Sequence, residues 1–192
     1  MTDLKSILIK TIGILTIGFI VSSCSPENKI SPEQAKKIAK EAYLYGYPLV
    51  MNYKTLYAYT LDKNSPEYKG GFNVKSCEAR VYTPEDKAIV TPNSDTPYCI
   101  FWSDISHEPV VVSVPEMEPD RYYSFQFIDL FSHNFAYVGT IATGNKAGKY
   151  IIAPMDWTGA KPDGITDIIY CESDLFLTIV RTQLMDENDL SH

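Results

Sequence analysis

The spacing of apolar and polar positions changes near Thr83. Between Ser31 and Tyr59 apolar side chains recur at the period of an α-helix, with lysines and glutamates on the opposite side. Beyond Thr83 the apolar runs are short, alternate at a period of two, and are rich in β-branched and aromatic residues. The pattern predicts an α+β, mainly β fold, with a helical segment over residues 31–60 and a β-sandwich over residues 72–172.

The helical segment has a clear start signal. In Ser31-Pro32-Glu33-Gln34 a serine caps the helix, proline stands where its missing N–H costs nothing, and Gln lies three residues after the cap. One face of the following turns is apolar, so we expect it to be buried. Gly46-Tyr47-Pro48 should kink or stop the helix, because proline removes a backbone hydrogen bond. We expect helix to resume over residues 49–59.

The sheet region consists of short runs separated by Pro, Gly, Asn and Asp. Their number and near-regular spacing favour an antiparallel, jelly-roll-like β-sandwich. An apolar stretch predicts a short closing helix over residues 173–184, and the chain length predicts a single domain over residues 31–192. The expected strands are 88–90, 98–102, 110–114, 122–128, 135–138, 150–152 and, as a further candidate, 168–170.

The start of the chain is typical of an export signal. A basic beginning is followed by an uncharged run over residues 11–21 and by small residues. This run is shorter than the roughly 20 apolar residues of a membrane-spanning helix, so cleavage is favoured over an uncleaved anchor. Val21-Ser22-Ser23-Cys24 resembles the lipobox of bacterial lipoproteins. It implies a signal peptide over residues 1–23, a lipid on Cys24 and a tether over residues 24–30.

That arrangement predicts a lipid-anchored protein of the cell envelope, outside the cytoplasm. Ser25 resembles the residue that sorts lipoproteins to the periplasmic face of the outer membrane, where the host has two membranes. The signal contains one Asp and two Lys, so its removal takes the net charge from −7 to −8. The remaining basic residues form no cluster, which argues against nucleic acid as a partner.

Besides Cys24 the chain has three cysteines. Their wide spacing fits neither a metal knuckle nor a redox pair. We expect buried free thiols at Cys77, Cys99 and Cys171, with one disulfide as the alternative, which export would permit.

Ordered motifs run from about Ile30 to the C-terminus. They are Ala42–Val50, Thr91–Tyr98, Arg121–Asp129, Ser132–Phe135, Gly139–Thr140 with Ala142–Gly144, and Arg181–Leu184. Together these motifs closely resemble the family catalogued as domain of unknown function 1254. The resemblance implies a helical segment leading into a β-sandwich of jelly-roll type, and it implies no reaction and no cofactor.

Members of that family usually continue into a second β domain, catalogued as domain of unknown function 1214. This sequence stops before it, near residues 185–192. A truncated or split version without catalytic activity is therefore one hypothesis. Its partners would be a separate second β domain or a second copy of the chain.

Two polar surfaces are candidate ligand sites. Asn93 and Asp95 lie between two expected strands, either as a polar cluster that binds a ligand or cation, or as a tight turn. Tyr122 and Gln126 share one strand face, which could stack on and hydrogen-bond a small molecule, or pack in a mixed interior. Asn134 completes the predicted ligand-binding set.

His133 is the candidate for acid–base chemistry, because an unperturbed histidine titrates near a pH of about 6.5. Asp129, four residues earlier, could hold the ring, and the alternative is a purely structural histidine. Arg121 and Arg181 could anchor nearby carboxylates such as Asp129, Glu172 and Asp174, or hold an anionic ligand.

Motifs with a defined mechanism are missing from the sequence. It has no Gly-x-Ser-x-Gly elbow, phosphate loop, dinucleotide fingerprint or His-Glu-x-x-His helix. We predict a lipid-anchored protein that binds a small polar or sugar-like ligand on its β-sandwich. The enzymatic alternative is a hydrolase or lyase that uses His133 with a nearby Asp. The sequence assigns no metal site.

Overall fold

The computed structural model describes residues 30–87, 91–186 and 189. The chain divides into two units, Met1–Tyr43 and Leu44–His192. The predicted signal peptide, the predicted lipid on Cys24, most of the tether and the expected strand 88–90 lie outside the described residues. Within the described ranges, no helix combines the length and the apolar character that crossing a membrane requires.

In the first unit the structure describes the beginning of helix α2 (Pro32–Leu56). Ser31 and Gln34 exchange hydrogen bonds: Ser31 N–H donates to Gln34 Oε1 at 2.9 Å, and Gln34 N–H donates to Ser31 Oγ at 3.2 Å. These bonds satisfy backbone donors that have no partner within the helix. The predicted helix start is confirmed.

Helix α2 continues past Pro48 and is followed directly by a short π-helix, η2 (Tyr57–Leu61). The helical prediction for residues 31–60 is confirmed, although the proline does not stop the helix. The expectation of a buried apolar face is wrong for most of its length. Among the described residues of α2 only Leu56 is buried, and Tyr45 and Val50 are 73% and 61% exposed.

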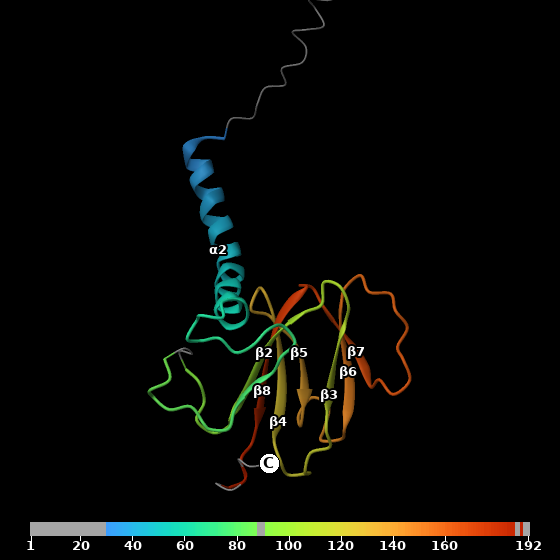
Figure 1. The fold of residues 1–192 in the computed structure, drawn as a ribbon. Helices are drawn as coiled ribbons and strands as arrows, with labels where there is room; N and C mark the ends of the chain where they lie inside the picture. The colour runs from blue at the N-terminus through green and yellow to red at the C-terminus, as the bar shows by residue number, and fades with distance from the viewer. Residues whose placement is uncertain (1–29, 88–90, 187–188, 190–192) are drawn as a thin grey trace, which may run out of the picture. The chain divides into compact units, whose positions relative to one another are not determined.

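Two β-sheets make up most of the second unit (Figure 1). The larger sheet has five antiparallel strands in the order β1-β2-β8-β4-β5, and the smaller has three in the order β3-β6-β7. The strands are β1 (Ser76–Glu78), β2 (Tyr98–Asp104), β3 (Val110–Val114), β4 (Tyr123–Asp129), β5 (Asn134–Gly139), β6 (Gly148–Pro154), β7 (Asp167–Cys171) and β8 (Leu175–Thr182).

The predicted closing helix over residues 173–184 is wrong, because this segment forms β8 inside the five-stranded sheet. Phe176, Thr178 and Val180 are buried and alternate with half-buried neighbours, as a strand requires. Both faces of β8 are largely covered, and its sequence is mostly apolar, with Thr178 as the polar residue inside the apolar run. Such a run does not distinguish a buried strand from a buried helix.

The expectation of a wholly antiparallel sandwich is also wrong at one place. β6 and β7 pair in parallel, with Ile151 opposite Ile168. A parallel pair needs a crossover connection rather than a hairpin, and residues 155–166 form that connection. The α+β, mainly β architecture is confirmed, and the jelly-roll connectivity stays a prediction.

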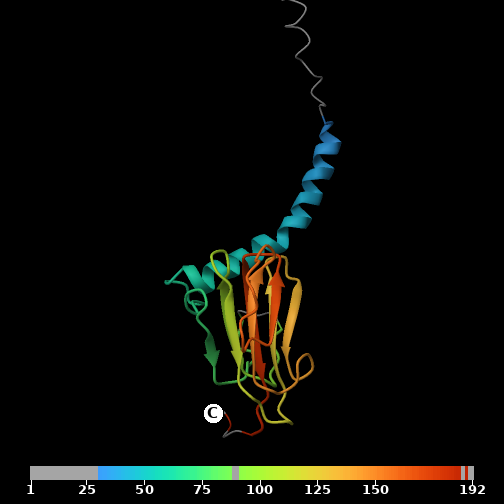
Figure 2. The same ribbon diagram turned by 90° about the vertical axis from the view of Figure 1, so that its right-hand side faces the viewer.

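The main core lies between the two sheets, which form two layers (Figure 2). Phe127 of β4 and Phe176 of β8 are fully buried, with ring centroids 6.1 Å apart. They belong to the same cluster as Val112 of β3 and Ile152 of β6. Burial of side chains from both sheets holds the layers together.

A disulfide between Cys77 and Cys99 joins β1 to β2, where the two residues are direct cross-strand partners. Cys171 is free and buried. The expectation of three free thiols is therefore wrong, and the alternative of one disulfide is correct. The crosslink holds an edge strand of three residues that has few ladder hydrogen bonds of its own.

Candidate functional site

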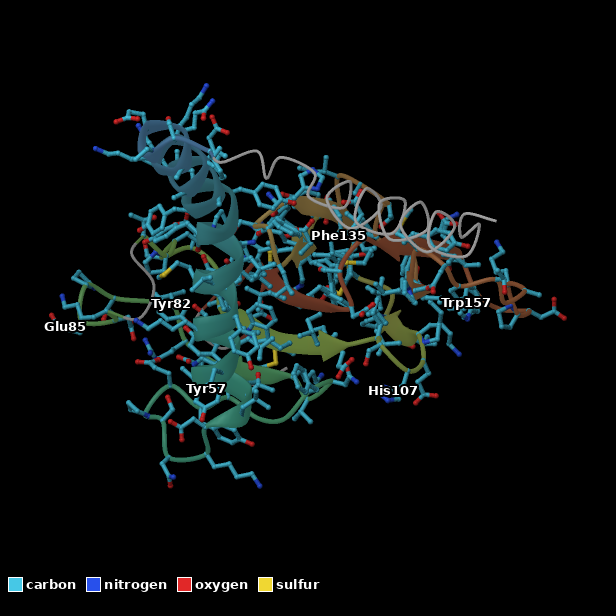
Figure 3. All side chains as sticks on the ribbon, turned by 90° about the horizontal axis from the view of Figure 1, so that it is seen from above. Tyr57, Tyr82, Glu85, His107, Phe135 and Trp157 are labelled. Carbon is cyan, nitrogen blue, oxygen red and sulfur yellow. A yellow bond between two sulfur atoms is a disulfide. The ribbon has the colours of Figure 1, made fainter. Side chains whose placement is uncertain are left out.

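One half of the outer face of the large sheet, the side turned away from the small sheet, is covered. Side chains from the end of α2, from η2 and from the following loop pack against β2 and β8 there, and Tyr82 lies on that side in Figure 3. The buried members of this second cluster are Leu56, Tyr59, Tyr82, Tyr98, Ile100 and Trp102. The half formed by β4 and β5 remains open, with Tyr122 and Tyr137 36% and 47% exposed.

Five side chains connect across this outer face, and we call them the polar row. Gln126 Nε2 donates to Asn134 Oδ1 at 2.8 Å, and Gln126 Oε1 accepts from Arg181 Nη1 at 2.7 Å. The Arg181 guanidinium lies 5.0 Å from the centre of the Tyr98 ring. Tyr98 Oη accepts from the Asn93 backbone N–H at 3.1 Å and from Asn93 Nδ2 at 2.8 Å. The row thus contains three of the predicted ligand residues.

The strand register explains why these side chains meet. Arg181 of β8 is the cross-strand partner of Ser124 on one side and of Tyr98 on the other, and Gln126 is the partner of Tyr137. Directly opposed residues of an antiparallel pair project from the same face. The period-2 prediction for β4 is confirmed, since Tyr123 and Phe127 belong to the main core.

A cavity of about 300 Å³ lies beside the polar row. We call it the tyrosine cavity, because Tyr122 and Tyr137 supply much of its lining together with Ser124, Gly139 and Ile141. A Cβ atom on Gly139 would lie 2.3 Å from the Tyr123 carbonyl oxygen, so a larger residue would push the two strands apart. Exposed aromatic rings next to hydrogen-bonding side chains suit a small polar ligand.

Asn93 builds a turn, as one of the two sequence interpretations expects. Its Oδ1 accepts from the backbone N–H groups of Asp95 and Thr96, both at 3.0 Å, and from Thr96 Oγ1 at 3.1 Å. This is how Asn side chains stabilise tight turns. Asn93 also belongs to the polar row, because its side chain donates to Tyr98 Oη. Asp95 is exposed and contributes only its backbone N–H to the turn.

Asp129 and His133 are close together, but they differ strongly in burial. Asp129 is 4% exposed, and its Oδ1 accepts from the N–H groups of Phe131 and His133 at 2.8 and 2.9 Å. The His133 side chain is 76% exposed, with Nδ1 3.9 Å from Asp129 Oδ2. Neither residue lines the tyrosine cavity. Asp129 therefore acts as the acceptor that shapes the turn between β4 and β5.

A second, larger cavity of about 540 Å³ is lined by the disulfide and by apolar side chains such as Val114, Phe125 and Val180. Arg121 lines it as well, 2.8 Å from Glu118 and 2.5 Å from Asp189. The hydrogen bond with Asp189 raises the pKa of Arg121, so this guanidinium stays charged and paired. The expectation that Arg121 pairs with Asp129, Glu172 or Asp174 is wrong.

Across residues 30–87, 91–186 and 189, no group of three or more His, Cys, Asp and Glu side chains is placed to bind a metal ion. The side chains of the polar row and the tyrosine cavity offer hydrogen bonding, aromatic ring faces and a positive charge.

The fold and this face define a two-sheet β protein with an open aromatic and polar surface on the larger sheet. Residues 72–192 match the family model described as "Protein of unknown function (DUF1254)", and the chain belongs to this family. No curated protein matches the chain.

The chain is similar to the crystal structure of the VPA0106 protein from Vibrio parahaemolyticus, with a TM-score of 0.67 and 27% identity. The match covers 81% of this chain and 34% of that chain, so the matched region spans about a third of the longer protein. An uncharacterized protein from Burkholderia cenocepacia matches at 14% identity over 88% of this chain and 42% of that chain. Its TM-score of 0.38 is too low to carry a structural argument.

Two parts of the site, Tyr98 and Tyr137, were not predicted from the sequence. For Arg181 the sequence left two roles open, pairing with a nearby carboxylate or holding an anionic ligand. The alternation along β4 carries a signal for Ser124, which stands two residues from both Tyr122 and Gln126. No local signal indicates Tyr98 or Tyr137, because their proximity depends on which strands pair.

Proposed function

We propose that this protein binds a small polar, sugar-like ligand on the open half of the outer face. The observation that supports the proposal is the polar row next to the tyrosine cavity. Tyr122 and Tyr137 offer ring faces to a sugar ring, while Ser124, Gln126 and Arg181 offer donors and acceptors for its hydroxyl groups.

The binding test uses the full chain in detergent and isothermal titration with D-glucose, D-galactose, D-mannose, N-acetyl-D-glucosamine and three uronates. Tyr137→Ala should weaken binding of any sugar that binds by roughly fivefold, equivalent to about 1 kcal/mol of ring stacking. Tyr170→Ala is the matched control, because Tyr170 lies on β7 of the other sheet and is 44% exposed, compared with 47% for Tyr137. Failure of every sugar to bind, or equal effects of the two variants, would contradict the proposal.

The proposal includes location. The protein would be a lipoprotein anchored through Cys24 after removal of residues 1–23, and it would work in the cell envelope. The Cys77–Cys99 disulfide is compatible with an oxidising compartment. Intact mass of protein from bacterial membranes should show acylated Cys24 as the first residue. An uncleaved and unacylated chain would refute this part.

The second candidate function is a hydrolase or lyase that uses His133, favoured by the 3.9 Å separation of His133 Nδ1 from Asp129 Oδ2. It predicts product release from a bound sugar that His133→Ala abolishes without weakening binding. The third candidate is a non-catalytic part of a longer arrangement with a second β domain, favoured by the match to a third of the Vibrio protein.

A further inference from the structure

The chain contains three arginines, and two of them are paired with carboxylates. Arg80 is 2.9 Å from Glu78 and 2.6 Å from Asp86. Arg121 likewise contacts two carboxylates, at 2.8 and 2.5 Å. Both guanidinium groups thus have their planar edges occupied by acidic side chains.

Arg181 differs from them within the described part of the chain. It donates a hydrogen bond from Nη1 to Gln126 Oε1 and lies over the Tyr98 ring, and neither contact involves a carboxylate. A guanidinium has five N–H donors, so the donors on Nε and Nη2 remain available. Gln126 and Tyr98 fix the plane of the group without neutralising its charge.

Glu78, a carboxylate on the neighbouring part of the sheet, does not serve as a partner of Arg181. Glu78 stands opposite Tyr98 in the ladder, one strand beyond Arg181. Lys69 and Arg80 each approach Glu78 to 2.9 Å, so its charge is already balanced. Among the described residues, the positive charge of Arg181 therefore has no carboxylate partner on the outer face.

Arg181 is also well placed for a ligand. It is the direct cross-strand partner of Ser124, which lines the tyrosine cavity, and it is half-buried rather than extended into solvent. Arginine held in one plane binds a carboxylate through two parallel hydrogen bonds, a geometry that lysine cannot reproduce. Because the whole chain is acidic, with a net charge of −7, an anion would be attracted here by local contacts and not by the overall field.

We infer that the ligand of the outer face carries a carboxylate, as a uronate-type sugar does, and that Arg181 binds it. The sugar ring then lies against Tyr122 and Tyr137, and the carboxylate accepts from the free edge of the guanidinium. This inference rests on the proposed function, and it adds the charge of the ligand and the residue that recognises it.

The test compares D-glucuronate, D-galacturonate and D-mannuronate with their methyl esters, which keep the ring but lose the charge. Isothermal titration uses the full chain in detergent, as wild type and as Arg181→Gln, Arg181→Lys and Lys149→Gln. Lys149 is an exposed residue of β6 in the other sheet, so its variant removes one positive charge away from the site.

At least one uronate should bind about tenfold or more tightly than its ester, and Arg181→Gln should remove that preference. Arg181→Lys should recover only part of it, and Lys149→Gln should leave it unchanged. The inference fails if neutral sugars or esters bind as tightly as the uronates, or if Arg181→Gln keeps the preference. In that result the proposed function survives, whereas absence of binding by every sugar overturns both.

Discussion

Substitutions at Asp129 test whether its carboxylate stabilises the turn between β4 and β5. Its buried carboxylate accepts two backbone hydrogen bonds, at 2.8 and 2.9 Å, in the turn between β4 and β5. Hydrogen bonds to a charged acceptor contribute about 1.5–3 kcal/mol each. Asp129→Ala should therefore lower the free energy of unfolding by about 3 kcal/mol, the lower end for two such bonds.

Asp129→Asn keeps one oxygen in place but removes the charge, so it should lower the free energy of unfolding by about 1–2 kcal/mol. His133→Ala should change it by less than about 0.5 kcal/mol, because that side chain is 76% exposed. Urea unfolding followed by tryptophan fluorescence measures all three. If Asp129→Ala is no more destabilising than His133→Ala, the carboxylate does not hold the turn and the reasoning is wrong.

Three further predictions concern the strands and the cysteines. The double variant Cys77→Ser, Cys99→Ser should lower the free energy of unfolding by about 3 kcal/mol, as expected for a crosslink across 22 residues. A loss below about 1 kcal/mol in urea unfolding would contradict this. Burial raises the pKa of the Cys171 thiol, so the folded protein should resist alkylation there at a pH of about 8. Peptide mapping should find Cys171 alkylated in urea but not in the folded protein, and equal labelling in both would count against its burial. Gly139→Ala should lower the free energy of unfolding by about 1–3 kcal/mol, because the new Cβ atom would meet the Tyr123 carbonyl oxygen. Gly71→Ala, with open space around it, should have little effect in the same assay. Equal losses would refute the close approach of Gly139 to the Tyr123 backbone.

The alternation along β4 was predictable, because the face on which each side chain lies depends only on the period of the strand. Phe127 is buried in the core, and Gln126 is on the outer face, as that period requires. The turn at Asn93 was one of two interpretations, since its residue types favour local hydrogen bonds. These features depend on a few neighbouring residues.

The position of Arg181 was not predictable from its surroundings in the sequence. The segment before it is mostly apolar, so its pattern predicted a helix and did not show the two faces of a strand. Its two ladder partners, Ser124 and Tyr98, lie far away along the chain and on different strands. Only the strand order brings them together.

The spacing of Asp129 and His133 fits two roles, and the acid–base role stays a prediction. Four residues separate them, which suits an acid–base pair as well as a turn. In the structure, Asp129 Oδ1 accepts hydrogen bonds from the backbone N–H groups of Phe131 and His133. Residue types alone do not distinguish this structural role from an acid–base role.

Chemical-shift mapping of the full chain in detergent, titrated with the tightest-binding sugar of the uronate panel, tests the ligand face most directly. The largest amide shifts should fall on Tyr122, Ser124, Gln126, Tyr137 and Arg181. Shifts concentrated instead around Cys99 and Leu184, which line the larger cavity, would place the ligand elsewhere and contradict the account.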